Sequence, residues 1–192
     1  MSVEQNRHAE VAKTIARVRA ICGSGDMSRD KLGQIEEVLL ELAARQDLFP
    51  DSEFGIPTDE KIRLYRLAED PDGGFALYLH AANVPAEVAP HNHATWAAIA
   101  GIGGEETNFL YERTNGDAPV LTGQRPIRKG ESISLMPDDV HSIRAGGTEP
   151  LKNLHLYGLA MEKLHDREFW DAKRAVWTRV PPTSGIIERR SA

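Results

Sequence analysis

The chain has 192 residues, of which 41% are hydrophobic and 27% are charged, as in an ordinary soluble globular protein. Its formal net charge of -6 argues against a nucleic-acid-binding protein, which needs a basic surface to neutralise phosphates. No apolar run is long enough to span a bilayer, the first residues are too polar for a secretory signal, and a lone cysteine excludes an internal disulfide, so we expect a cytoplasmic protein without membrane contact.

Residues 1–50 are expected to be helical. An apolar stripe at three- and four-residue spacing runs from Val11 to Ile21 and predicts a first helix. Ser28 is a suitable N-cap for a second helix, in which leucine and isoleucine repeat the same spacing. Pro50 ends this part of the chain, because proline cannot continue the helical hydrogen bonds.

From about residue 60 to residue 160, short apolar runs alternate with clusters of Gly, Pro, Asp and Asn. Asn115-Gly116 is typical of a hairpin turn between two of these runs. About eight short strands at near-regular spacing indicate an all-β barrel or double sheet. The runs are RLYRLAE, FALYLHA, FLYER, PVLTGQRPI, SISLM, HSIRA and LHLYG.

The last part of the chain is expected to cover the barrel. Residues 166–178 predict either a closing helix or an extended segment, with Phe169, Trp170 and Val176 as anchors, and the tail beyond is expected to be mobile. We therefore expect one domain over residues 1–192. Its parts are a helical cap (1–50), a β-barrel (60–160), and a C-terminal packing segment with its tail (161–192).

Three histidines form the strongest candidate site. His91 and His93 are two residues apart at the predicted start of a strand, so both side chains point to the same face. A second segment runs from Gly130 through a strand to Pro137, and His141 then opens the next strand. This pattern predicts a metal site made of His91, His93 and His141.

These two motifs, in this order, resemble the metal-binding motifs of the cupin family. The resemblance implies a mainly β fold, the double-stranded β-helix or jelly-roll barrel, here with an N-terminal helical segment. The glutamate that many cupins carry four or five residues after the second histidine is replaced by Ala97 and Ala98. Three neutral imidazoles then leave open positions on the metal, as catalytic sites do, although the same ligands also suit zinc. Glu105 and Glu106 are expected to be turn or exposed-strand residues.

A further segment narrows the resemblance. Thr148-Glu149-Pro150 followed by Asn153-Leu-His155-Leu-Tyr157 is similar to the thiol dioxygenases, the group of cysteine dioxygenase and mercaptopropionate dioxygenase. The resemblance implies a ferrous ion, Fe(2+), on the three histidines. It also implies that a small thiol of the cysteine or mercapto-acid type is oxidised by O2 to its sulfinate.

The same resemblance assigns roles to one face of this strand. Tyr157 would donate a hydrogen bond to bound substrate or oxygen, and His155 would orient the Tyr157 hydroxyl. Asn153 stands where the family has serine and can still hydrogen-bond His155. The alternatives are a core aromatic residue for Tyr157 and a hydrogen-bonded core residue for His155.

The substrate-binding residues are less well defined. Leu64 stands where the family has the arginine that grips the substrate carboxylate. Arg66 lies on the same strand face and can substitute, unless it is a solvated surface arginine. Trp96 is expected to lie in the barrel core or in the wall of the substrate pocket, where it would contact the substrate. His80 is expected to be a core or surface residue.

Two other functions remain open. One is another three-histidine cupin dioxygenase, for example one that cleaves a diketone, but such an enzyme gives no reason for the segment around His155 and Tyr157. The other is a non-catalytic cupin that binds a metal or small ligand, for which the sequence offers no output module. The expected partners are a small thiol and O2, with no nucleic acid, while association into a homo-oligomer is left open.

Overall fold

A computed structural model describes residues 1–23, 25–71, 73–114 and 118–190. Its first part is helical, as predicted, and Ser28 caps the second helix by accepting a hydrogen bond from the backbone N–H of Lys31. Ser2 and Gln5 form a capping box at the start of the first helix. No helix in the described part of the chain is both long and apolar enough to cross a membrane. The helices are α1 (Val3–Cys22), α2 (Arg29–Ala43), η1 (Gln46–Leu48) and α3 (Asp51–Phe54).

The rest of the chain is mainly β. One six-stranded sheet has the order β12-β1-β2-β9-β4-β7 and the other the order β11-β10-β3-β8-β5-β6. Counted in chain order from β2 to β9, the strands alternate between the two sheets except at the β5–β6 hairpin, which lies within one sheet, and this is the order of a jelly roll, or double-stranded β-helix. The predicted fold class is thereby confirmed. The strands are β1 (Ile62–Glu69), β2 (Ala76–Ala82), β3 (Ala86–His91), β4 (Ala97–Gly103), β5 (Glu105–Glu112), β6 (Val120–Ile127), β7 (Ser132–Leu135), β8 (Val140–Gly146), β9 (Leu151–Tyr157), β10 (Glu168–Asp171), β11 (Val176–Arg179) and β12 (Ile187–Glu188).

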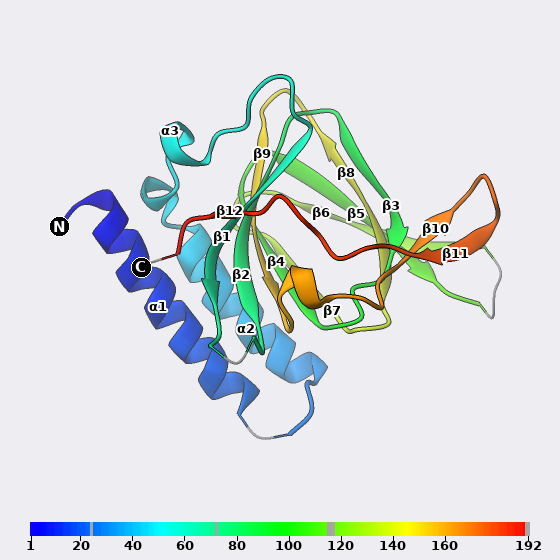
Figure 1. The fold of residues 1–192 in the computed structure, drawn as a ribbon, viewed down its shortest axis with the longest axis horizontal. Coiled ribbons are helices and arrows are strands. Elements are labelled where there is room, and N and C mark those ends of the chain that lie inside the picture. The colour runs from blue at the N-terminus through cyan, green and yellow to red at the C-terminus, as the bar shows by residue number, and fades with distance from the viewer. Residues whose placement is uncertain (24, 72, 115–117, 191–192) are drawn as a thin grey trace.

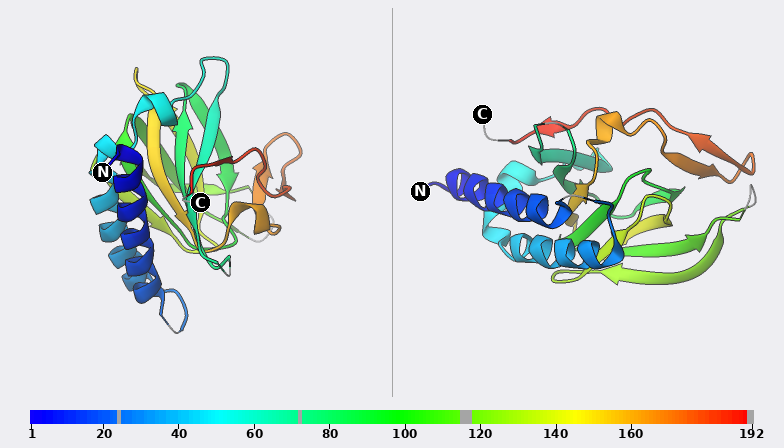
Figure 2. Two further views of the ribbon diagram at one scale, coloured as in Figure 1. Left: turned by 60° about the vertical axis from the view of Figure 1, so that its left-hand side comes forward. Right: turned by 90° about the horizontal axis from the view of Figure 1, so that it is seen from below.

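The two faces of the first sheet have different environments. Helices α1 and α2 lie side by side along its outer face (Figures 1 and 2), where Leu77, Leu79, Leu154 and Leu156 pack against them. Because side chains alternate along a strand, the neighbours of these leucines point into the barrel. They include polar residues of β2 and β9, which the outer leucines shield from solvent on one side.

The C-terminal segment is extended. After η2 (Met161–Lys163), β10 and β11 form a hairpin that projects at the end of the barrel away from the helices (Figure 1). The alternative of a closing helix is therefore wrong, because β10 pairs with β3 through Phe169 and His91. Val176 is 44% exposed and anchors nothing.

The tail, which is expected to be mobile, contains a short strand in its described part. Strand β12 pairs in parallel with β1, and the backbone N–H of Arg189 donates to the carbonyl of Arg66 at 2.9 Å. The short alternating segment around Ile187 thus adds an edge strand. The predicted turn at Asn115-Gly116 lies outside the described residues, but the β5–β6 hairpin on either side of it is present.

Candidate metal centre

The three histidines of the predicted metal site meet at one end of the barrel. His91 is the last residue of β3 and lies opposite His141 on β8, after a register shift in the pairing. His93 follows in the loop, so the expected strand start is in fact a strand end. Ala94 has a left-handed backbone (φ 53) and donates to the carbonyl of Pro137, which ties the His93 loop to the turn before His141.

The three imidazole rings are close together and buried. The ring centroids of His91 and His141 are 4.6 Å apart, those of His93 and His141 4.9 Å, and those of His91 and His93 5.0 Å. One nitrogen of each ring lies within 4.8 Å of the others, and the Nε2 atoms of His93 and His141 are 3.3 Å apart. Three rings that converge in this way are compatible with binding one metal ion.

Hydrogen bonds orient two of these rings. His91 donates from Nδ1 to the carbonyl of Ala89 at 2.8 Å, and His141 donates from Nδ1 to the Oδ1 atom of Asn108 at 2.7 Å. Because each Nδ1 faces an oxygen acceptor, Nδ1 carries the proton and Nε2 has a free lone pair. Among the described residues, the buried Nδ1 of His93 has no hydrogen-bond partner.

The histidines are neutral, as metal ligands must be. Burial lowers the pKa of His91 to about 3, and burial together with the neighbouring imidazoles holds the pKa values of His93 and His141 well below 6.5. No carboxylate belongs to this cluster in the described part of the chain. Three buried, neutral nitrogen donors fit a divalent transition metal.

This burial predicts acid sensitivity of the metal-free protein. Five buried histidines, including His80 with its pKa lowered to about 4, stay neutral in the folded state but gain protons on unfolding below about pH 6.5. Glu106 has a raised pKa, so it binds a proton in the folded state between about pH 4.5 and 7 and there adds stability as the pH falls. This is one group against five histidines that reduce the stability. The free energy of unfolding should therefore fall as the pH drops from about 6.5 towards 4, with roughly 3 kcal/mol from His80 alone.

Urea unfolding of chelator-treated protein at pH 7 and pH 5 measures this effect. We expect a clearly lower midpoint at pH 5. An equal or higher midpoint at pH 5 would mean that the folded protein accepts protons on these histidines without loss of stability.

No family model and no curated protein sequence matches this chain. One similar solved structure is an uncharacterized conserved protein with a double-stranded β-helix domain from Klebsiella pneumoniae subsp. pneumoniae MGH 78578. It is 18% identical with a TM-score of 0.43, and the alignment covers 57% of this chain and 81% of that chain. A cupin superfamily protein from Desulfitobacterium hafniense DCB-2 is 10% identical (TM-score 0.43; 59% and 86%). An oxalate oxidase in complex with the substrate analogue glycolate is 16% identical (TM-score 0.43; 53% of each chain).

Likenesses this distant carry no argument about activity, and the structures named above do not point to thiol dioxygenases. The fold follows from the strand order, in which β3 and β8 of one sheet supply the histidines. The fold is the double-stranded β-helix, or jelly roll. The two histidine motifs of the sequence meet on neighbouring strands of one sheet.

Strand β9 brings Tyr157 and His155 together on the inner face of the barrel. The Tyr157 hydroxyl is 3.0 Å from Nδ1 of His155, and its ring centroid is 5.3 Å from that of His93. Burial raises the pKa of Tyr157 to about 12, so the hydroxyl stays protonated and can donate a hydrogen bond. Asn153 departs from its expected partner, because its amide donates to Glu106 at 3.1 Å rather than to His155.

Glu106 corrects a prediction from the sequence. It is fully buried inside the barrel, not exposed, and accepts hydrogen bonds from Asn108 at 3.0 Å and from Asn153. Burial raises its pKa to about 7. Through Asn108 it is connected to His141 of the metal cluster. The signal that could have found it is the two-residue spacing of Glu106 and Asn108 on one strand face.

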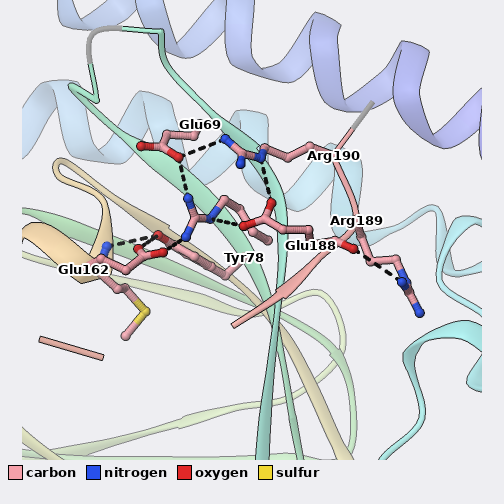
Figure 3. A network of polar contacts seen from close by, with 8 residues as sticks. Glu69, Tyr78, Glu162, Glu188, Arg189 and Arg190 are labelled. Atoms are coloured by element: carbon pink, nitrogen blue, oxygen red, sulfur yellow. Dashed lines mark hydrogen bonds and ion pairs between the residues drawn. The ribbon is translucent and has the colours of Figure 1, made fainter. Parts of the chain in front are cut away.

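Arg66 is neither solvated nor free. It is buried on the barrel side of β1 and pairs with Glu69 at 2.5 Å, with Glu188 at 3.4 Å and with Glu162. Figure 3 shows Glu69, Glu162 and Glu188 converging from three segments of the chain around this position. Its guanidinium is therefore matched by the protein's own carboxylates, which explains its burial without any substrate.

Trp96 lies on the other side of the first sheet. It belongs to the hydrophobic cluster between the helices and the sheet, with Ala98 and Ile102 of β4, whereas Ala97 faces the barrel. Its ring also packs against Gly158, where a Cβ atom would lie 2.3 Å from the indole nitrogen. This placement argues against the predicted contact with substrate.

Arg167 is a candidate that the sequence reading missed. It is 8% exposed, and one guanidinium nitrogen donates to the Thr183 hydroxyl at 3.4 Å. In the described part of the chain its Nε has no hydrogen-bond partner, and it forms no ion pair with a carboxylate. Its guanidinium lies 5.2 Å from the ring of Phe169, which stacks on His91 at 4.6 Å. Its positive charge is close enough to lower the pKa values of His91 and His93. A buried cation without an ion-pair partner, close to the three-histidine cluster, is suited to binding an anion.

Proposed function

We propose that this protein is a non-haem Fe(II) thiol dioxygenase that oxidises a small thiol carboxylate to its sulfinate with O2. The observation that supports this most is the Tyr157 hydroxyl, held by His155 beside the three-histidine cluster. The unpaired Arg167 at the same cluster adds a counter-charge for a carboxylate. Both groups are needed to orient a substrate that carries a thiol at one end and an anion at the other.

Each residue has a defined task in this proposal. Bound iron would supply the redox chemistry between dioxygen and sulfur. Arg167 would bind the substrate carboxylate with its planar guanidinium. Tyr157 would donate a hydrogen bond to substrate, with its proton oriented by His155. Phe169, stacked on His91, would keep water from the cluster.

Oxygen uptake by protein of known iron content tests the proposal. Iron-loaded protein should consume O2 with 3-mercaptopropionate or cysteine and release the corresponding sulfinate, while propionate, which lacks the thiol, should give no uptake. Cysteamine, which lacks the carboxylate, should react more slowly. If fully loaded protein consumed no O2 with any of the three thiols, the proposal would be wrong. Uptake with a diketone instead would favour another three-histidine dioxygenase.

A further inference from the structure

A second cluster of ligating side chains lies deeper in the barrel, apart from the three-histidine cluster. It consists of His80 on β2, Glu106 on β5 and His155 on β9. One nitrogen or oxygen of each residue lies within 4.8 Å of the other two, and all three residues are buried. Such a set of two imidazoles and a carboxylate is a common set of ligands for divalent transition metals.

The barrel topology creates this cluster. His80 lies opposite Asn153 in the pairing of β2 with β9, and His155 follows on the same face of β9. The rings of His80 and His155 meet edge to face, with centroids 4.9 Å apart. Glu106 belongs to the opposite sheet and contacts Asn153 across the interior. The two sheets thus bring together three side chains that are far apart in the sequence: His80 and His155 from one sheet and Glu106 from the other.

Several polar atoms at this point have no partner among the residues that the structure describes. They are Nδ1 of His80, Nε2 of His155 and Oδ1 of Asn153. Buried polar atoms are nearly always hydrogen-bonded, so three of them in one place call for a bound group that accepts their lone pairs. The Oδ1 atom of Asn153 can only accept. The amide nitrogen of the same side chain donates to Glu106, and this bond fixes the direction in which Oδ1 points.

The carboxylate at this point also lacks a counter-charge. Within the described chain Glu106 forms no ion pair with a basic side chain, and only the amides of Asn108 and Asn153 donate to it. The buried Arg66 on β1 is already paired with three other carboxylates. Burial raises the pKa of Glu106 to about 7, so without a cation this carboxyl group is neutralised by a proton. A bound water would leave it in that state, whereas a divalent cation would stabilise the ionised form as a ligand.

We propose that His80, Glu106 and His155 bind a second divalent transition-metal ion, with Oδ1 of Asn153 as a further ligand. The ion is of the class that accepts mixed nitrogen and oxygen donors, such as Zn²⁺ or Co²⁺. This site stands on its own geometry and does not depend on the proposed reaction at the three-histidine cluster.

An ion here would fix the proton on His155. With Nε2 of His155 as a ligand, its proton resides on Nδ1 and is donated to the Tyr157 oxygen, 3.0 Å away. The Tyr157 hydroxyl hydrogen is then free to point elsewhere, towards the side of the ring near His93. The second ion would in this way set the direction in which Tyr157 donates.

Metal stoichiometry tests the proposal without any activity assay. Full-length protein stripped with a chelator is titrated with Co²⁺, followed by calorimetry and by visible absorption. We expect two equivalents for the unaltered protein. Glu106→Gln should weaken one of them at least about 100-fold and keep the other. The matched control is Glu105→Gln, on the opposite face of β5, where an exposed glutamate pairs with Arg128, and it should retain both equivalents.

His93→Ala separates the two sites. It should lose the equivalent at the three-histidine cluster and keep the one that Glu106→Gln loses. His80→Gln serves as a second variant if Glu106→Gln does not fold, and it should also lose only the deeper site. A single equivalent in the unaltered protein, or two in both Glu106→Gln and His80→Gln, would overturn the proposal. If only one equivalent binds, we would place a buried water between His80, Glu106 and His155. The proposed reaction at the three-histidine cluster would not be affected by this result.

Discussion

Replacing His93 with alanine is expected to lower the affinity of the three-histidine cluster for Fe²⁺ by at least about 1000-fold and to abolish O2 uptake with thiols. The reason is that Nε2 of His93 lies 3.3 Å from that of His141, so one of three convergent donors is removed. Two imidazoles without a carboxylate do not hold a ferrous ion against water and buffer. Iron content after gel filtration and the initial rate of O2 uptake measure the two effects.

The matched control is His165→Ala. His165 is an exposed histidine outside both clusters, and its removal should change neither iron content nor rate. The fold should survive in both variants, because the His93 side chain forms no hydrogen bond through Nδ1 and alanine only deletes atoms. A His93→Ala protein that still bound iron tightly and consumed O2 would show that the reaction centre lies elsewhere.

The second large effect concerns the substrate carboxylate. Arg167→Gln should raise the KM for 3-mercaptopropionate by about 30-fold to 100-fold, which is the loss of a charge-assisted hydrogen bond to a carboxylate. The rate with cysteamine, which has no carboxylate, should change little. The expectation rests on the burial of Arg167 and on its free Nε beside the three-histidine cluster.

Two further arginines make this test specific. Arg174→Gln removes an exposed arginine from the same C-terminal segment and should leave the KM unchanged. Arg66→Gln addresses the residue that the sequence favoured. We expect Arg66→Gln to lower the thermal stability, because Glu162 loses its arginine and Glu69 and Glu188 keep only Arg190. A large rise in KM in Arg66→Gln with none in Arg167→Gln would reverse the assignment.

The barrel could be predicted because its signals are local. A strand is a short segment. Alternating apolar residues with Gly or Pro at both ends predict a strand even when the neighbouring strand in the sheet is unknown. The histidine motifs are local in the same sense, since His91 and His93 are two residues apart and His141 follows a fixed strand-and-turn pattern. The helical cap was equally visible, from apolar spacing and from the cap at Ser28.

The C-terminal segment could not be predicted in the same way. Its composition suits either a helix or a strand, and pairing decides between them. Phe169 is extended because β3 offers an open edge at His91, and Ile187 is ordered because β1 offers another. Helix and strand signals of short segments are weak beside such tertiary contacts.

By itself the sequence determined the mainly β barrel, its helical cap and a three-histidine cluster. Only the tertiary structure decided the charge environment inside the barrel. The sequence predicts a turn or exposed-strand position for Glu106 and leaves Arg66 as either a carboxylate binder or a solvated arginine. The fold instead buries Glu106 without a cation and surrounds Arg66 with carboxylates. It also put Arg167, from the last third of the chain, beside the histidines. The physical reason is that burial and pairing of a charge depend on which strands meet across the barrel, and this information is not local in the sequence.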